Sequence, residues 1–237
     1  MSPPRTSLPL EHLEDFTKRE WCNALLSDPS ITKIQKRALP SPTDPDVSNT
    51  FFNHTLFTDD AVRAFLSLYR PGRGRGRSIA DAEIAGDALL GDEQGQTDNH
   101  TPTDKDIVED AQDEKQLDTQ ADLDEPEALM LVSIGSGIDG GVRRLHGGVT
   151  ATLLDHVMGT LISYVHGNTS ATAELSVKYK EAITTPRVVL CRARIVREAG
   201  RWIETVGWIE DGEGTVFAEG RGAFVKSRVD NGGWTKM

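Results

Sequence analysis

The stretch LHGGVTATLLDHVMG, residues 145–159, decides the fold because it predicts one long, strongly apolar helix. Two rows of apolar side chains at i+4 spacing run along it and continue beyond it, so we expect the helix to span residues 148–165. The rows are Val149, Leu153, Val157, Leu161 and Val165, and Leu154, Met158 and Ile162. A helix that is apolar around so much of its circumference has to be nearly enclosed by other elements.

Strand-like segments lie on both sides of this helix in the sequence. The run EALMLVSIG precedes it, and residues 172–183, 188–197, 202–210 and 215–226 follow it with alternating or β-rich patterns. The links between the later segments are short, which favours antiparallel neighbours in a four-strand meander. We therefore expect an α+β fold in which a curved antiparallel sheet wraps around the central helix.

One carboxylate, Asp155, interrupts the apolar helix. On a helical wheel it shares its face with Ile162 and with Gly148, Ala151 and Gly159, small residues that leave room for a ligand to approach. A carboxylate placed against a ligand can act as a general base. The alternative is a structural carboxylate bonded to nearby backbone or exposed at a gap in the sheet, and periodicity alone leaves both open.

The helix opens on His146, Gly147 and Gly148. Glycines let a ligand come close to the backbone, and the first N–H groups of a helix lack internal partners, so this end can bind developing negative charge. Eight residues separate Gly147 from Asp155, roughly 12 Å along the axis. One protomer cannot easily place both groups on a single carbonyl, which suggests a site shared between two copies of the chain.

The rest of the chain divides into further regions. Residues 1–70 contain two predicted helices, one over residues 10–26 and one that starts after Thr58 with Val62, Phe65, Leu66 and Tyr69 as its apolar face. A proline-rich loop separates the two helices. Residues 128–228 are the predicted compact domain, and residues 229–237 are a C-terminal tail.

Residues 71–127 have a different composition. RPGRGRGR leads into a tract, residues 81–127, that holds 17 acidic residues and 2 lysines, whereas the whole chain has a net charge of −11. The remainder of the chain is therefore mildly basic. Such a polar tract cannot bury enough apolar surface to fold, so we predict a disordered insertion. Contact of the arginines with nucleic acid or another anionic surface is the less favoured alternative.

Several classes of protein are disfavoured. Cys22 and Cys191 form no CxxC pair, so neither a zinc site nor a disulfide framework is indicated. No apolar run of about 18 residues predicts a membrane span. The N-terminal residues lack the apolar core of a secretory signal and are too acidic for a typical transit peptide, so we expect an intracellular protein, cytoplasmic rather than mitochondrial.

HGGVTATLLDHVMG followed by TAELSVKYKEAI resembles the hotdog-fold acyl-CoA thioesterases, in the PaaI-like branch of the 4-hydroxybenzoyl-CoA thioesterase superfamily. The likeness covers roughly residues 128–226, and residues 1–70 resemble the N-terminal extension of fungal-type members. The resemblance implies hydrolysis of acyl-CoA or acyl-carrier-protein thioesters by a homodimer or homotetramer, with neither metal nor cofactor.

The resemblance also implies residue roles. The Gly147 N–H would polarise the thioester carbonyl, His146 would orient it, and Asp155 of the opposite subunit would act as general base or nucleophile. Thr172 would hold the water or the carboxylate, with Thr169 and Ser170 as alternatives because the preceding link is one residue longer than usual. Some members carry an asparagine shortly before the histidine, where this chain has Asp139.

The predicted substrate-binding residues are Gly148 and a set of basic side chains that could meet the phosphates of coenzyme A. The basic set is Lys178, Lys180 and Arg221, with Arg143, Arg144 and Lys226 as weaker candidates. His156 points away from Asp155 on the wheel and is expected to pack rather than to catalyse. A non-catalytic acyl-thioester-binding or scaffold protein of the same fold is the alternative function, and a hotdog hydratase or dehydratase ranks last.

Overall fold

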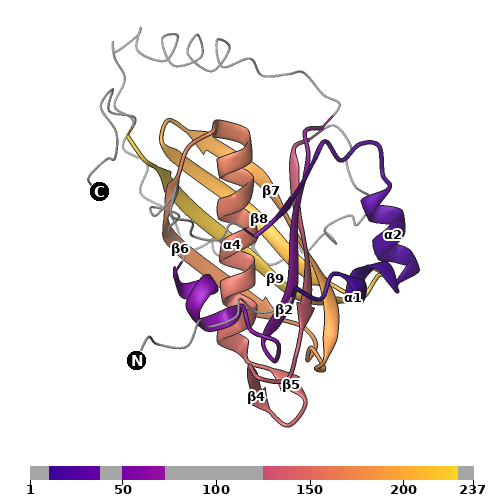
Figure 1. The fold of residues 1–237 in the computed structure, drawn as a ribbon. Helices are drawn as coiled ribbons and strands as arrows, with labels where there is room; N and C mark the ends of the chain where they lie inside the picture. Colours follow the sequence, from indigo (N-terminus) through magenta and orange to yellow (C-terminus); the bar gives the residue numbers. More distant parts are fainter. Residues whose placement is uncertain (1–10, 38–49, 73–124, 229–237) are drawn as a thin grey trace, which may run out of the picture. The chain divides into compact units, whose positions relative to one another are not determined.

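The computed structural model describes residues 11–37, 50–72 and 125–228. In these residues a seven-stranded antiparallel sheet has the order β1-β2-β3-β7-β8-β9-β6 and curves around a single long helix, α4 (Figure 1). The strands are β1 (Lys33–Lys36), β2 (Val62–Arg70), β3 (Glu127–Ile134), β6 (Ser170–Tyr179), β7 (Arg187–Ala199), β8 (Trp202–Glu210) and β9 (Val216–Lys226). The small hairpin β4 (Asp139–Gly141) and β5 (Arg144–Leu145) leads into α4. This is the hotdog fold.

The helix α4 (Gly147–His166) confirms the predicted central helix to within one residue at each end. Both of its apolar rows pack against other elements, because Leu153, Leu154, Met158 and other residues on several faces are fully buried. Glycines on the sheet make this close approach possible. A Cβ atom on Gly220 would lie 3.2 Å from Leu154 Cδ1, so a larger residue there would push the sheet away from the helix.

The strands after α4 have the predicted bounds to within a few residues, but the predicted order of a four-strand meander is only partly correct. β7, β8 and β9 are successive neighbours, whereas β6 pairs with β9 and not with β7. The link over residues 180–186 therefore crosses three strand spacings, about 14 Å. Seven residues can extend over roughly 23 Å, so a short link does not require adjacent strands here.

The helix predicted after Thr58 is wrong, because Val62–Arg70 is strand β2, paired with β3 and β1. Ala64, Leu66 and Leu68 face the outer side of the sheet, and Phe65 packs toward α4 beyond a β-bulge. A strand buried on both faces has a nearly continuous apolar sequence, which matches helical spacing as well as strand spacing. The residues of β2 thus belong to the sheet rather than to a helical extension.

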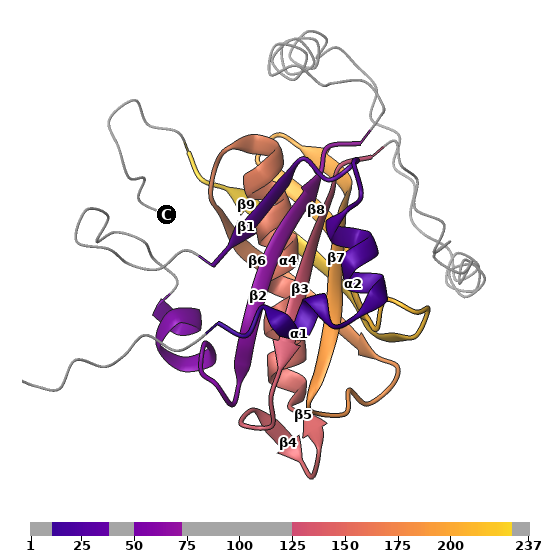
Figure 2. The ribbon, with the colours of Figure 1, turned by 45° about the vertical axis from the view of Figure 1, so that its right-hand side comes forward.

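The helix predicted over residues 10–26 is two short helices, α1 (Glu14–Thr17) and α2 (Glu20–Leu26), separated by extended backbone at Arg19. They lie across the outer face of the sheet over β2, β3 and β7 (Figure 2). The Asp15 carboxylate anchors them, since it accepts hydrogen bonds from Arg63 Nε at 3.1 Å and from Ser133 Oγ at 2.6 Å. Phe16 and Cys22 complete a second apolar cluster there.

Between this part and β2, η1 (Phe52–Leu56) is a turn of π-helix that packs on α4. The predicted tail, most of the predicted loop and nearly all of the predicted insertion lie outside the described residues. Among the residues that are described, no helix is both long and apolar enough to cross a membrane.

Candidate active site

The first turn of α4 is closed by its own N-cap residue, His146. Its backbone is extended, with φ −65° and ψ 132°, and its Nδ1 accepts a hydrogen bond from the Gly148 N–H at 2.9 Å. The entering chain is held on both sides, because Leu145 N–H donates to Ile183 O and His146 N–H donates to Ile138 O. The histidine therefore fixes the helix end in place of the usual serine or aspartate cap.

In this arrangement the Gly147 N–H is available as a hydrogen-bond donor at the first turn of α4. The N–H groups of Val149 and Thr150 both donate to the carbonyl of His146, and that of Gly148 is capped. For Gly147 N–H, no acceptor is found among residues 11–37, 50–72 and 125–228. A helix N-terminus carries partial positive charge, so this N–H is suited to an anionic oxygen.

Asp155 and Thr172 are brought together as predicted. Thr172, near the start of β6, donates a hydrogen bond from Oγ1 to Asp155 Oδ1 at 2.6 Å. The alternatives Thr169 and Ser170 do not take this position, since Thr169 Oγ1 instead lies 2.8 Å from Ser227 Oγ. Asp155 is only partly buried, so the carboxylate is held on one side and open on the other.

The open side of Asp155 faces a cavity of about 360 Å³ between α4, the first residues of β6 and the β1–β2 side of the sheet. Thr172, Gly159 and Phe224 line it near Asp155. Further along the helix its lining includes Thr160, Ser163 and Tyr164. The space predicted beside the carboxylate is therefore present, with Gly159 on its wall.

His156 is confirmed as a packing residue. Its ring lies 4.3 Å from that of Phe52 and 5.6 Å from that of Phe65, measured between centroids. Burial among these rings lowers the pKa of His156 to about 4, although the neighbouring Asp155 charge opposes this shift. The ring is neutral at physiological pH and serves to join α4 to η1 and β2.

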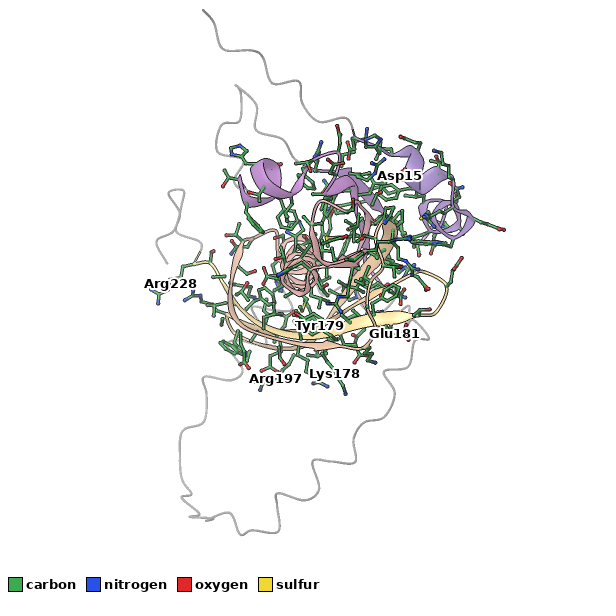
Figure 3. The ribbon with its side chains drawn as sticks, turned by 90° about the horizontal axis from the view of Figure 1, so that it is seen from below. Asp15, Lys178, Tyr179, Glu181, Arg197 and Arg228 are labelled. Atoms are coloured by element: carbon green, nitrogen blue, oxygen red, sulfur yellow. The ribbon has the colours of Figure 1, made fainter. Side chains whose placement is uncertain are left out.

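Tyr179 contacts the start of α4, which the sequence did not predict. At the end of β6 its hydroxyl donates to the Gly147 carbonyl at 2.9 Å, although the residue is 56% exposed. Seen from below, Tyr179 lies on the helix side of the sheet and Lys178 on its outer side (Figure 3). The strand alternation of Tyr179 with Lys178 was visible in the sequence, but its meeting with the helix start depends on the curvature of the sheet.

The predicted basic substrate contacts do not converge on the cavity. Arg221 lines a separate depression on the outer face of β6, β8 and β9, and the Lys180 ammonium pairs with Glu219. Among the described residues no three His, Cys, Asp or Glu side chains are grouped as metal ligands would be. The role of Lys178, Lys180 and Arg221 toward coenzyme A stays a prediction.

Residues 143–218 match the family model of the thioesterase superfamily. The matched segment contains the helix start, Asp155 and Thr172. This segment is therefore similar to the thioesterase superfamily. No match is found among curated proteins.

Solved structures similar to this chain include three from different sources. A Bacillus halodurans protein crystallised with CoA is 28% identical over 45% of this chain and 70% of its own, with a TM-score of 0.40. A conserved Pseudomonas aeruginosa protein is 24% identical over 42% and 80%, with a TM-score of 0.40. Zebra fish thioesterase superfamily member 2 is 20% identical over 42% and 73%, also with a TM-score of 0.40.

Asp139 stands where the resemblance leads to the expectation of an asparagine, just before the matched segment. Its Oδ1 accepts a hydrogen bond at 2.6 Å from the hydroxyl of Thr185, a residue that is 1% exposed. Asp139 thereby ties the hairpin before α4 to the link that enters β7. Its carboxylate is used in this structural contact.

Proposed function

We propose that this chain hydrolyses acyl-CoA or acyl-carrier-protein thioesters, as a member of the PaaI-like branch. The observation that carries the proposal is the Asp155 carboxylate, which lies in the matched segment, is fixed by Thr172 at 2.6 Å and is open to a cavity. A carboxylate held by one donor and open on its other side can take a proton from water.

In the proposed reaction, water attacks the thioester carbonyl carbon and gives its proton to Asp155. The carbonyl oxygen gains negative charge, which the Gly147 N–H stabilises as an oxyanion donor. The tetrahedral intermediate then collapses, the C–S bond breaks, and the leaving thiolate takes the proton from Asp155, which regenerates the carboxylate. The products are a free carboxylic acid and a thiol, and no oxidant or reductant is consumed.

Two copies of the chain supply the two groups. Gly147 and Asp155 lie on one helix about 12 Å apart, too far for both to act on one carbonyl. β6 is a ten-residue edge strand beside this helix, and an unpaired strand edge can pair with its copy. A symmetric dimer through β6 would bring the Gly147 end of one helix toward Asp155 of the other.

The test is thiol release from a panel of acyl-CoAs by the purified full chain, compared with the Asp155→Asn variant. We expect hydrolysis by the wild type and a loss of at least about a hundredfold in kcat for the variant, the value of a positioned base. Glu174→Gln is the matched control, because it changes an exposed carboxylate on β6 close to Thr172 in sequence.

Two outcomes would contradict the proposal: a fully active Asp155→Asn variant, or no thiol release from any acyl-CoA or acyl-carrier protein. If acyl-CoA raised the melting temperature of the wild type without being hydrolysed, a non-catalytic binding protein would be the better account.

A further inference from the structure

The end of the cavity remote from Asp155 is built from polar side chains of three different elements. Ser67 from β2, Tyr164 from α4 and Gln35 from β1 line it together. Ser67 Oγ lies 2.8 Å from the Tyr164 hydroxyl, which donates to Gln35 Oε1 at 2.9 Å. This leaves Ser67 as the donor to Tyr164, so the three groups form one directed chain of hydrogen bonds.

This polar wall is positioned by the fold. In the pairing of β1 with β2, Gln35 lies opposite Ser67 and therefore on the same, helix-facing side of the sheet. The Tyr164 ring stacks on Tyr69 with centroids 5.0 Å apart, and the Lys33 ammonium lies 5.5 Å from the Tyr164 ring centre. The ring is thus held in place independently of its hydroxyl.

The wall stands at a defined distance from the reacting end. Nine residues separate Asp155 from Tyr164 on α4, about 14 Å along the axis. Thr160 and Ser163 line the wall between them, and Ser163 Oγ is bonded to Gly159 O of its own helix. An acyl group whose thioester lies at Asp155 would point its far end toward Tyr164 and Gln35.

We propose that Gln35, Tyr164 and Ser67 select acyl groups whose far end carries a hydrogen-bonding oxygen over acyl groups that end in a methyl. The inference rests on the proposed function for the placement of the thioester at Asp155. A methyl end at this wall would displace water from the hydroxyl and amide groups. It could not replace the hydrogen bonds that the water made, which is unfavourable. A hydroxyl end can donate and accept there.

The test compares matched pairs of acyl-CoAs, from butanoyl to decanoyl, each with its ω-hydroxy counterpart. Dissociation constants are measured calorimetrically on the full-length Asp155→Asn variant, and kcat/KM is measured on the wild type. At the chain length that reaches the wall, we expect the hydroxy compound to be preferred about tenfold, the value of one good hydrogen bond. Tyr164→Phe and Gln35→Leu, each in both backgrounds, should bring this ratio close to one.

Tyr69→Phe is the control, because it removes a hydroxyl from the ring stacked on Tyr164 without changing a residue that lines the cavity. It should keep the preference. Ratios near one at every chain length, or a preference that survives both Tyr164→Phe and Gln35→Leu, would overturn the inference. A binding preference that those variants abolish, in a protein that releases no thiol, would uphold the polar wall and refute hydrolysis.

Discussion

At the scale of single residues, the contact between Thr172 and Asp155 is the most specific feature of the site. One hydroxyl on a strand holds a carboxylate on the helix at 2.6 Å, and the other side of the carboxylate is open to the cavity. Small residues around Asp155 in the sequence predicted the space, and the resemblance predicted the threonine. The hydrogen bond itself forms because β6 starts beside the middle of α4, an arrangement that the sequence pattern did not predict.

Thr172→Val is expected to lower kcat by about tenfold or more with little change in KM. Valine keeps the shape of threonine but cannot donate, and a hydrogen bond to a charged group is worth about 1.5–3 kcal/mol. Thr172→Ser keeps the donor and should restore most of the rate. Steady-state kinetics on the three proteins decides this, and equal kcat for the valine variant and wild type would show that Thr172 does not position Asp155.

His156 predicts a specific dependence of stability on pH. Its pKa of about 4 in the folded chain lies below the ordinary value of 6.5, so the unfolded chain binds the extra proton between these two pH values. The free energy of unfolding should therefore fall as pH drops from about 6.5 to about 4, by up to roughly 3 kcal/mol. Above pH 6.5 this contribution is fully present.

Urea titrations of wild type and His156→Phe at a series of pH values test this. Phenylalanine can retain the contacts with Phe52 and Phe65 but cannot be protonated. The difference in unfolding free energy between the two proteins reports on His156 alone, because carboxylates that titrate in the same pH range are present in both. A stability difference that stays constant from pH 4 to 7 would contradict the assignment.

At the scale of elements, the start of α4 combines a capped turn with one free donor. A Cβ atom on Gly147 would lie 3.5 Å from the Tyr179 ring, an ordinary contact, so Gly147→Ala should fold normally. Its methyl group would nevertheless stand beside the N–H where the substrate carbonyl is proposed to bind. We expect kcat/KM to fall at least tenfold with an unchanged melting temperature.

Gly140→Ala gives the contrasting result, because a Cβ atom there would lie 2.9 Å from His146 Cα. This substitution should lower the melting temperature as well as activity. Thermal melts and thiol-release assays on the two variants separate the effects. Wild-type activity for Gly147→Ala would mean that the substrate does not approach this backbone.

A second element-scale feature is the ionic cluster formed by the last residue of β2, the first residue of β3 and the middle of β7. The Glu127 side chain is 2% exposed and pairs with Arg70 at 2.5 Å and Arg192 at 2.7 Å. Glu127→Gln would remove the carboxylate that both guanidinium groups share and leave Arg70 with Asp28 and Arg192 with Glu210, at a cost of about 3 kcal/mol in the free energy of unfolding. Chemical denaturation should show this loss.

The matched control is Glu204→Gln, which breaks a pair with Arg197 whose side chains are 34% and 63% exposed. An exposed pair of this kind is worth less than about 1 kcal/mol. Similar losses for the two variants would show that burial does not strengthen the Glu127 cluster.

Some of the helices and strands could be predicted from the sequence and others could not. The central helix was predictable because two apolar rows at i+4 spacing allow no other structure of that length. β2 was not, because a strand buried on both faces is apolar nearly throughout. The neighbour of β6 was also missed, since strand order depends on sheet curvature, which residue patterns along one strand do not encode.

At the scale of the whole molecule, the proposed site requires two chains. In the proposed reaction Gly147 and Asp155 of one helix serve different sites, so a dimer would contain two sites, each with one group from either chain. This makes a prediction about dimers that combine two impaired variants. Heterodimers of Gly147→Ala and Asp155→Asn would have one site with both groups intact and one with both groups altered.

Co-expression with two different affinity tags and purification through both tags would isolate these heterodimers. Their specific activity should be about half that of the wild type, because one of two symmetric sites is restored. Each variant alone, carried through the same purification, should stay at about a tenth of the wild-type activity or less. If the heterodimer is as inactive as its parents, Gly147 and Asp155 serve the same protomer, and the helix N-terminus must act on the substrate somewhere other than at the thioester carbonyl.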